Sequence, residues 1–393
     1  MISNLKASFI EAFLFLNYNM ISKNFIKNYN IPMIFVLSLL PLICIIGIPL
    51  YIYYNGLVWQ EPVIFIIGWF LAGLGITMGY HRLFAHKTFK AKPVFEWILM
   101  LFGSMALQNT IIKWCSDHRT HHQSLDTNKD PYSIKKGFFH AHIGWIFKKE
   151  NNYKANNVSD LEKKSAIKFQ NKYYWQVAIF LSFILPLLIG LLYNRPIGGL
   201  LWGGFLRVTL VHHGTFFINS LCHFLGKKDY ELNTTAKDSW FMAFFTFGEG
   251  YHNYHHKFQW DYRNGIKWYN YDPGKWIIKF LSLFNITHSL KKASNYSIIK
   301  AKADTLNMKI EIMSKELYFY HIYENKIKLI TENITKNLNS WKNLELKYKL
   351  FKKIEITKRI KKNYQQKEKL YKFEIQKSLS ALMVLSVNIK NLI

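Results

Sequence analysis

Cysteine is scarce in this chain. Among 393 residues there are only Cys44, Cys115 and Cys222, and none of them forms a C-x-x-C pair. The sequence therefore supports neither a disulfide framework nor a zinc site built from thiolates. A bound metal would depend on other ligands.

Acidic residues are also few. The chain has 24 Asp and Glu against 52 Lys and Arg, which gives a formal net charge of +28. Such a charge is typical of nucleic-acid-binding proteins, but here the basic residues lie in loops between apolar segments and in a polar tail, without a recognisable nucleic-acid-binding fold. We therefore expect no nucleic-acid partner. A general bias of the chain toward Lys, Asn and Ile explains the charge equally well.

Charge is missing altogether from the longest apolar segments. A helix needs about 20 apolar residues to cross the hydrocarbon layer of a membrane. We predict an all-α integral membrane protein with four transmembrane helices, near residues 33–54, 62–80, 175–193 and 196–222. The fourth contains Arg207, His212 and His213, and ionisable groups inside a span indicate function or a position at the interface.

The remaining charge predicts the orientation. The Lys-rich loop 82–172 belongs in the cytoplasm by the positive-inside rule, because the short turns 55–61 and 194–195 together hold a single Arg. Both termini are then cytoplasmic. We expect a cytoplasmic segment 1–32, a membrane domain 33–290 and a Lys-rich helical extension 295–393.

Histidine is clustered. "HRLFAH" holds two histidines, and "DHRTHH" and "HNYHH" share the spacing H-x-x-H-H, which on a helix directs three imidazoles to one face. The predicted topology brings all three boxes to the cytoplasmic side as a histidine-rich cap. The eight residues are His81, His86, His118, His121, His122, His252, His255 and His256.

Imidazole ligands without thiolates suit Fe, Cu, Ni or Zn rather than Mg or Ca. Eight ligands are too many for one ion, so two metal ions are the simplest interpretation. Among the candidate metals, redox-active iron is the one of chemical interest. His223 in "NSLCH" is a ninth candidate, with Asn219 one helical turn earlier. His140, His142, His288 and His321 lack ligand spacing, and His212 and His213 suit helix packing.

These motifs resemble the membrane acyl-CoA desaturases of the delta-9, stearoyl-CoA type. The match runs in order through "GITMGYHRLFAHKTFKA", "LQNTIIKWCSDHRTHHQSLDTNKDPY", "GFFHAHIGW", "NSLCHFLG" and "FGEGYHNYHHKFQWDYRNG". The resemblance implies four spans, a cytoplasmic cap and a di-iron centre held by nine histidines. It also implies that the protein uses O2 to insert one cis double bond into a saturated acyl chain.

The resemblance also assigns roles to single residues. It makes the eight histidines and His223 iron ligands, with Asn219 a ligand through water. Residues that match a kink in the acyl tunnel are Gln108, Trp114 and Thr215, those that match contacts to the CoA end are Asn109, Asp117 and Arg207, and those that match the tunnel end are Trp69 and Gly73.

Three positions modify this expectation. The chain has Ser116 where many relatives have Arg, so that Lys148 and Lys149 are candidates to supply the charge for CoA, and Tyr132 where many have His. The bulky Trp69 leads us to expect a shortened tunnel and acyl chains of C18 or below.

The partners follow from the chemistry. We expect a fatty acyl-CoA substrate, O2, membrane lipid and an external electron donor of the ferredoxin, cytochrome b5 or reductase type, because no haem-binding segment, flavin site or four-cysteine iron–sulfur pattern is visible. Two alternatives stay open: a histidine-rich membrane hydroxylase or ketolase, and a non-enzymatic membrane scaffold that acts through the amphipathic, Lys-rich residues 295–393.

Overall fold

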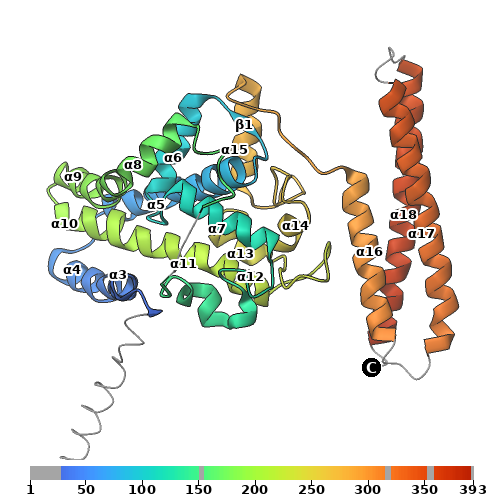
Figure 1. The fold of residues 1–393 in the computed structure, drawn as a ribbon, viewed down its shortest axis with the longest axis horizontal. Coiled ribbons are helices and arrows are strands. Elements are labelled where there is room, and N and C mark those ends of the chain that lie inside the picture. The colour runs from blue at the N-terminus through green and yellow to red at the C-terminus, as the bar shows by residue number, and fades with distance from the viewer. Residues whose placement is uncertain (1–27, 150–154, 315–319, 352–357, 391–393) are drawn as a thin grey trace, which may run out of the picture. The chain divides into compact units, whose positions relative to one another are not determined.

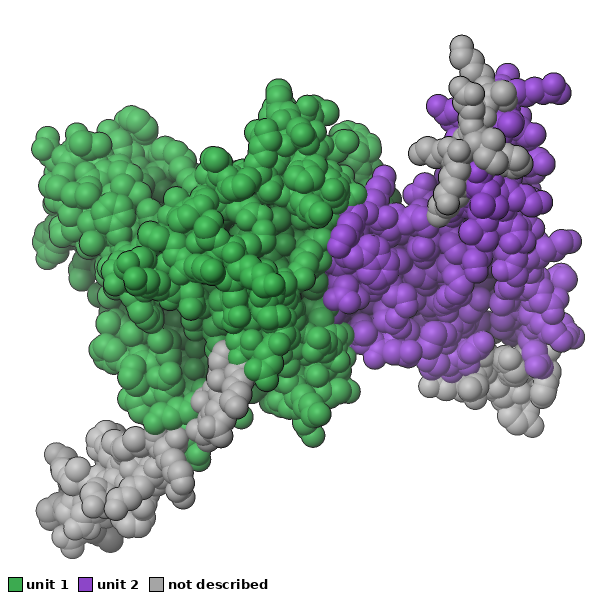
Figure 2. Space-filling model, turned by 45° about the horizontal axis from the view of Figure 1, so that its top comes forward, with its two compact units in different colours: residues 1–225, 239–251, 262–290 green, residues 226–238, 252–261, 291–393 purple. Residues whose placement is uncertain are grey.

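The computed structural model describes residues 28–149, 155–314, 320–351 and 358–390 (Figure 1). Most of the predicted segment 1–32 therefore lies outside the described residues. Figure 2 colours two compact units: unit 1 is residues 1–225, 239–251 and 262–290, and unit 2 is residues 226–238, 252–261 and 291–393. The predicted boundary between 290 and 295 stays a prediction, because unit 2 also takes two segments from the predicted membrane domain.

Four helical runs are the longest elements of unit 1 (Figure 1). The first is α3 (Ile31–Leu42), η1 (Ile43–Gly47) and α4 (Ile48–Asn55), and the second is α5 (Gln60–Leu74) and η2 (Gly75–Ala85). The third is α8 (Ser165–Ile179), η5 (Phe180–Ile184) and α9 (Leu185–Leu191), and the fourth is α10 (Pro196–Gly199), η6 (Leu200–Leu206) and α11 (Arg207–Asn219).

The first three runs are long and apolar enough to cross a membrane. Their outward faces carry large apolar side chains, such as Ile45 at 72% and Ile66 at 53% exposure, which lipid would cover. The prediction of an all-α integral membrane protein is confirmed. The fourth predicted span lies on α10, η6 and α11 but is not among the three, so its crossing stays a proposal.

Local signals set the ends of the first run. The side chain of Asn30 accepts a hydrogen bond from the Met33 amide (3.3 Å), and Pro32 occupies the first turn, where its missing N–H costs nothing. Gly56 follows α4 with a φ of 69°, a left-handed conformation that glycine adopts without strain. The chain therefore reverses between the first two runs.

An ion pair joins the turn between the first and second runs to the turn between the third and fourth runs. Glu61 is fully buried, and its Oε1 lies 2.8 Å from Arg195 Nε. The guanidinium also donates to the carbonyls of Asn55 (2.8 Å) and Gly56 (2.6 Å). Gly198 leaves room for the acid, because a Cβ there would lie 2.0 Å from Glu61 Oε1.

The shorter elements of unit 1 are α6 (Pro93–Ser104), α7 (Ile111–Gln123), η3 (Ile134–Lys136), η4 (His140–Gly144), α12 (Leu221–Phe224), α13 (Trp240–Phe245), α15 (Pro273–Leu281), η7 (Ser282–Phe284), β1 (Lys90–Ala91) and β2 (Thr287–His288). The two strands are antiparallel, with Lys90 opposite His288. Helix α6 packs closely on η2, because a Cβ on Gly75 would lie 2.1 Å from the Gly103 amide nitrogen. This approach fixes the position of η2, which carries the first histidine box.

Unit 2 contains α14 (His252–Lys257), α16 (Asn295–Ser314), α17 (Tyr320–Phe351) and α18 (Lys358–Lys390). Helices α16, α17 and α18 lie side by side (Figure 1). Their core includes Ile310, Trp341 and Leu382, each at most 1% exposed. The extension is therefore helical, as predicted.

Candidate metal centre

Unit 1 brings six of the nine predicted ligand histidines together. His81 lies near the end of η2 and His86 follows it, while α7 carries His118, His121 and His122, and α12 carries His223. Helix α7 begins where Thr110 accepts a hydrogen bond from the Lys113 amide (3.2 Å), so the H-x-x-H-H box occupies its last turns. The box therefore presents its rings to one side, as the spacing predicts.

The six imidazoles form two groups. Ring nitrogens of His81, His86, His118 and His122 lie within 4.8 Å of one another, and so do those of His121 and His223. Within the first group, His86 Nε2 lies 2.8 Å from His118 Nε2. This spacing places several lone pairs around one point, as metal binding requires.

Helix α14 of unit 2 carries the third box, His252, His255 and His256. Its His252 and His256 nitrogens lie 3.1 Å apart, one helical turn from each other. Asn253 anchors the helix, because its side-chain oxygen accepts from the amides of residues 229, 230 and 231 (3.0, 2.8 and 3.2 Å). The geometry within this box again fits shared ligation.

Burial lowers the pKa of two candidate ligands, His86 and His122. It lowers the pKa of His86 well below the usual value, and the neighbouring His81 lowers that pKa further. Burial, followed by the neighbouring His86, likewise lowers the pKa of His122. Both rings are therefore neutral near pH 7, which is the form that binds a metal.

In three candidate ligands, a carboxylate or a phenol lies beside the Nδ1 nitrogen of the histidine. His121 Nδ1 lies 2.9 Å from Asp130 Oδ1, and His81 Nδ1 lies 3.0 Å from Glu249 Oε2. His118 Nδ1 lies 3.3 Å from the hydroxyl of Tyr132. A carboxylate accepts the Nδ1 proton and so directs Nε2 to the metal. Imidazole nitrogens oriented in this way fit a borderline metal such as iron.

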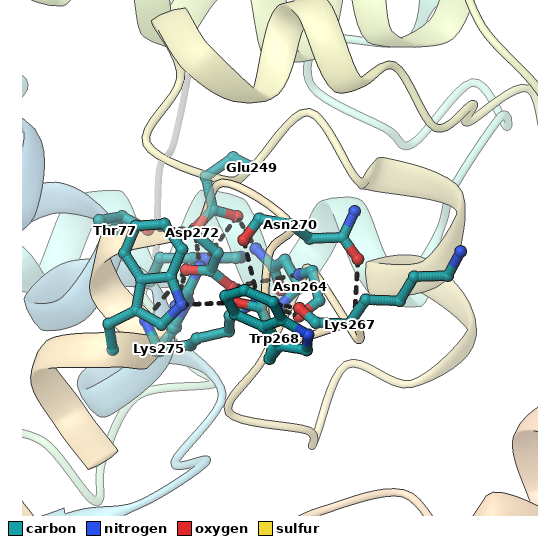
Figure 3. A network of polar contacts seen from close by, with 12 residues as sticks. Thr77, Glu249, Asn264, Lys267, Trp268, Asn270, Asp272 and Lys275 are labelled. Atoms are coloured by element: carbon teal, nitrogen blue, oxygen red, sulfur yellow. Dashed lines mark hydrogen bonds and ion pairs between the residues drawn. The ribbon is translucent and has the colours of Figure 1, made fainter. Parts of the chain in front are cut away.

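Glu249 belongs to a larger buried network (Figure 3). It accepts hydrogen bonds from Asn264 Nδ2 (2.6 Å), from Arg82 Nη2 (3.2 Å) and from the Thr77 hydroxyl. Burial alone would raise the pKa of Glu249, but His81 and Arg82 outweigh burial and hold that pKa at about 2. The carboxyl therefore stays ionised and remains an acceptor.

The same network fixes the loop after Glu249. Arg82 Nη1 lies 2.8 Å from Asp272 Oδ1, and Asp272 Oδ2 accepts from the Asn264 amide at 2.9 Å. Lys275 Nζ donates to three backbone carbonyls between residues 265 and 270 (Figure 3). Each buried charge thus has a partner, which offsets the cost of its desolvation.

A small cavity, partly open to its surroundings, adjoins this site within unit 1. Its walls include the predicted substrate residues Trp69, Gly73 and Thr215, together with Thr77, Phe247 and Glu249. Because Glu249 both lines the cavity and holds His81, the cavity lies beside the histidine cluster.

The predicted kink residues form a chain of hydrogen bonds. Gln108 Nε2 donates to Thr215 Oγ1 (2.8 Å), and Trp114 Nε1 donates to Gln108 Oε1 (3.4 Å). The ring of Trp114 stacks on His118, with centroids 4.9 Å apart. The three residues therefore connect the cavity wall with a candidate metal ligand.

One known protein family matches most of this chain. The profile described as Fatty acid desaturase matches residues 12–281. The chain belongs to the fatty acid desaturase family. Similar relatives are "Probable acyl-CoA desaturase" of Schizosaccharomyces pombe, 40% identical over 66% of this chain and 54% of that protein, and "Acyl-CoA desaturase 1" of Saccharomyces cerevisiae, 38% identical over 67% and 54%. "Acyl-CoA Delta(11) desaturase" of Trichoplusia ni is 34% identical over 69% of this chain and 83% of that protein. The chain spans about half the length of the two yeast relatives, 54% of each.

Arg207 is surrounded by protein. It is fully buried, and its guanidinium donates to the carbonyls of Gly203 (3.0 Å), Ser182 (3.1 Å) and Met105. This arrangement ties the helical runs together, and the predicted contact of Arg207 with CoA stays a prediction.

Three further predicted residues, Asp117, Asn109 and Asn219, lie in different surroundings. Asp117 is paired with Lys113 (2.7 Å), and the Asn109 amide donates to the Tyr174 hydroxyl (2.8 Å). Asn219 is the last residue of α11, next to the segment that carries His223. The substrate and water-mediated roles of these three residues remain proposals.

Sequence reasoning missed three residues of the site: Asp130, Glu249 and Phe247. All three lie inside the motifs "NKDPY" and "FGEG", but nothing in their spacing indicates which side chains they meet. The only available signal was an acidic residue close to each of two histidine boxes.

Proposed function

We propose that this chain is an O2-dependent acyl-CoA desaturase that inserts a cis double bond at position 9 of a saturated fatty acyl chain. The observation that carries the proposal is the cavity beside a cluster of buried imidazoles, two of which lie against carboxylates. Family membership agrees with it. Acyl-CoA is taken from the names of the relatives, and the position rests on the resemblance in the motifs, since a relative named for the Delta(11) position is also similar.

We propose a di-iron centre held by all nine histidines, with Asn219 a ligand through water. Six of these histidines already form two groups within unit 1, and α14 carries the remaining three in a box with the same spacing as that of α7. Bound iron supplies the oxidising power that an unactivated methylene requires, because such a carbon has no acidic proton.

The protein's own residues then place the substrate. The cavity keeps water from the acyl chain, and the Thr215–Gln108–Trp114 chain holds its bend next to His118, so that one pair of neighbouring methylenes faces the cluster. Each methylene loses one hydrogen, and O2 with two electrons and two protons becomes two waters. The electrons come from an external donor.

Trp69 bears on the length of the acyl chain. It lines the cavity and packs against Phe247, with ring centroids 4.6 Å apart. We propose that it favours chains of C18 or below. A Trp69→Ala variant with unchanged product lengths would contradict this.

The test uses iron-loaded membranes with stearoyl-CoA, O2, NADPH and a reductase system. We expect a cis-9 product that the His121→Ala variant does not form, with a parallel loss of bound iron. The matched control is His288→Ala, because His288 is exposed on β2 outside the cluster. A hydroxylated product would favour the hydroxylase alternative, and equal activity of the His121→Ala variant would overturn the site.

A further inference from the structure

Phe247 adopts an unusual backbone conformation beside the cavity. Its φ is 54°, a left-handed value that costs a non-glycine residue energy, and Gly248 follows with a φ of 97°. Phe247 nevertheless has a buried side chain, at 5% exposure. The strained turn therefore directs a large apolar ring inward rather than toward solvent.

The ring occupies space that glycine leaves open. A Cβ on Gly73 of α5 would lie 2.1 Å from Phe247 Cε2, so no other residue fits at position 73 without moving this ring. The ring also lies 4.6 Å from Trp69, tilted by 49°, and 5.9 Å from Phe70. Trp69, Gly73 and Phe247 line the cavity, and Phe70 packs against the Phe247 ring.

The same turn reaches the histidine cluster. Glu249 follows Phe247 by two residues, and its carboxylate lies 3.0 Å from His81 Nδ1. The backbone of Gly248 is held against Asp272, whose Oδ1 would lie 2.9 Å from a Cβ at that position. The short, buried segment from Phe247 to Glu249 therefore fixes the distance between the Phe247 ring and the His81 side chain.

We propose that Phe247 determines the acyl-chain length that this protein accepts, by forming with Gly73 the wall against which the methyl end of the chain rests. This inference rests on the proposed function and goes beyond Trp69, because the wall is carried by the turn that also holds a metal-facing histidine. Additional methylenes would have to displace a buried ring that packs on two other aromatic side chains.

The test compares Phe247→Ala with the parent chain and with Phe280→Ala, a control that removes an exposed phenylalanine (58%) of α15 outside the cavity. Desaturation of an equimolar mixture of palmitoyl-, stearoyl- and arachidoyl-CoA is measured first. We expect the ratio of C20 to C16 products to rise about tenfold in Phe247→Ala, the discrimination that a methylene in an apolar pocket provides. The control is expected to keep the ratio of the parent chain.

Two further measurements keep a folding defect separate from the inference. Thermal stabilisation by each acyl-CoA reports binding without turnover, and Phe247→Ala is expected to move the best-stabilising length from C18 or below to C20. Gly73→Ala is expected to lose binding, and adding Phe247→Ala is expected to restore it. If the parent chain desaturates but Phe247→Ala keeps its length profile in both assays, the inference is wrong. If the parent chain forms no desaturated product, the proposed function fails instead.

Discussion

At the scale of single residues, buried acids determine which nitrogen of a histidine faces the cluster. Asp130 is fully buried, and besides His121 it accepts hydrogen bonds from the amides of Asp126 and Tyr132, both at 3.2 Å. A carboxylate held by three donors cannot easily turn away from the ring. The Asp130 side chain is therefore a positioning group for His121.

We expect Asp130→Asn to weaken iron binding about 10- to 100-fold, because the amide is a poorer acceptor for the Nδ1 proton and leaves the ring orientation less defined. Iron affinity is measured by competition with a chelator on the purified protein. Asp304→Asn serves as control, since Asp304 is about half exposed and pairs with Lys300 on α16. Equal affinity of the Asp130→Asn variant and the parent chain would remove the positioning role.

The sequence predicted the candidate ligands better than the residues around them. A box such as H-x-x-H-H is local, so helical geometry alone aligns its rings, and unit 1 does bring His81, His86 and the histidines of α7 together. Glu249 and Phe247 meet partners more than 150 residues away in the chain. Such contacts depend on the packing of distant segments, which spacing does not encode.

At the scale of elements, α16 supports the loop that anchors the third histidine box. Lys309 of α16 donates to the carbonyl of Lys228, and Lys302 Nζ lies 5.2 Å from the centroid of the Tyr230 ring. Tyr230 is one of the residues whose amide binds Asn253 of α14 (2.8 Å). The first helix of the extension thus has a different local role from α17 and α18.

We expect a chain that stops after Ser314, and so keeps α16, to retain iron and desaturation. A chain that stops after Ser294 is expected to lose part of its iron, because the loop before α14 loses its support. Product formation and iron content of both membrane preparations are compared with those of the full chain. Inactivity of both, with iron intact, would favour the scaffold alternative, in which residues 295–393 carry the function.

Hydropathy located the apolar part of each span and missed the polar continuation. The third run is kinked at Tyr173 (φ −117°, ψ 25°), close to the predicted start near 175, and the segment before the kink begins at Ser165. In that segment Gln170 is buried against protein: it accepts from the Ile111 amide (2.8 Å) and donates to Ser104 (2.9 Å). The second run continues from residue 80 to Ala85, where Arg82 is paired with Glu249 and Asp272. Polar groups with partners inside the protein can extend a helix that hydropathy would end.

At the scale of the whole molecule, the distribution of charge indicates one orientation. Loop 82–172 is Lys-rich, while the turn 55–61 has no Lys or Arg. We propose that the histidine cluster and both termini face the cytoplasm. All three cysteines are buried, so an introduced surface cysteine can be labelled selectively.

We expect a membrane-impermeant maleimide to label Leu57→Cys in intact cells and Lys135→Cys only after permeabilisation. Leu57 is 53% exposed, and Lys135 is also exposed, so access depends on the side of the membrane rather than on burial. The unsubstituted chain is the control for background labelling. The reverse pattern would invert the proposed topology.

The ion pair between Glu61 and Arg195 can form only late in biosynthesis. Glu61 leaves the ribosome with the second helical run, and Arg195 follows 134 residues later. Until then the carboxylate lacks the guanidinium that offsets its burial in the finished protein. A nascent chain interrupted before residue 195 therefore keeps an acid that resists tight packing of its first hairpin, a chemical difference by which a cell can distinguish a half-made membrane bundle from a complete one.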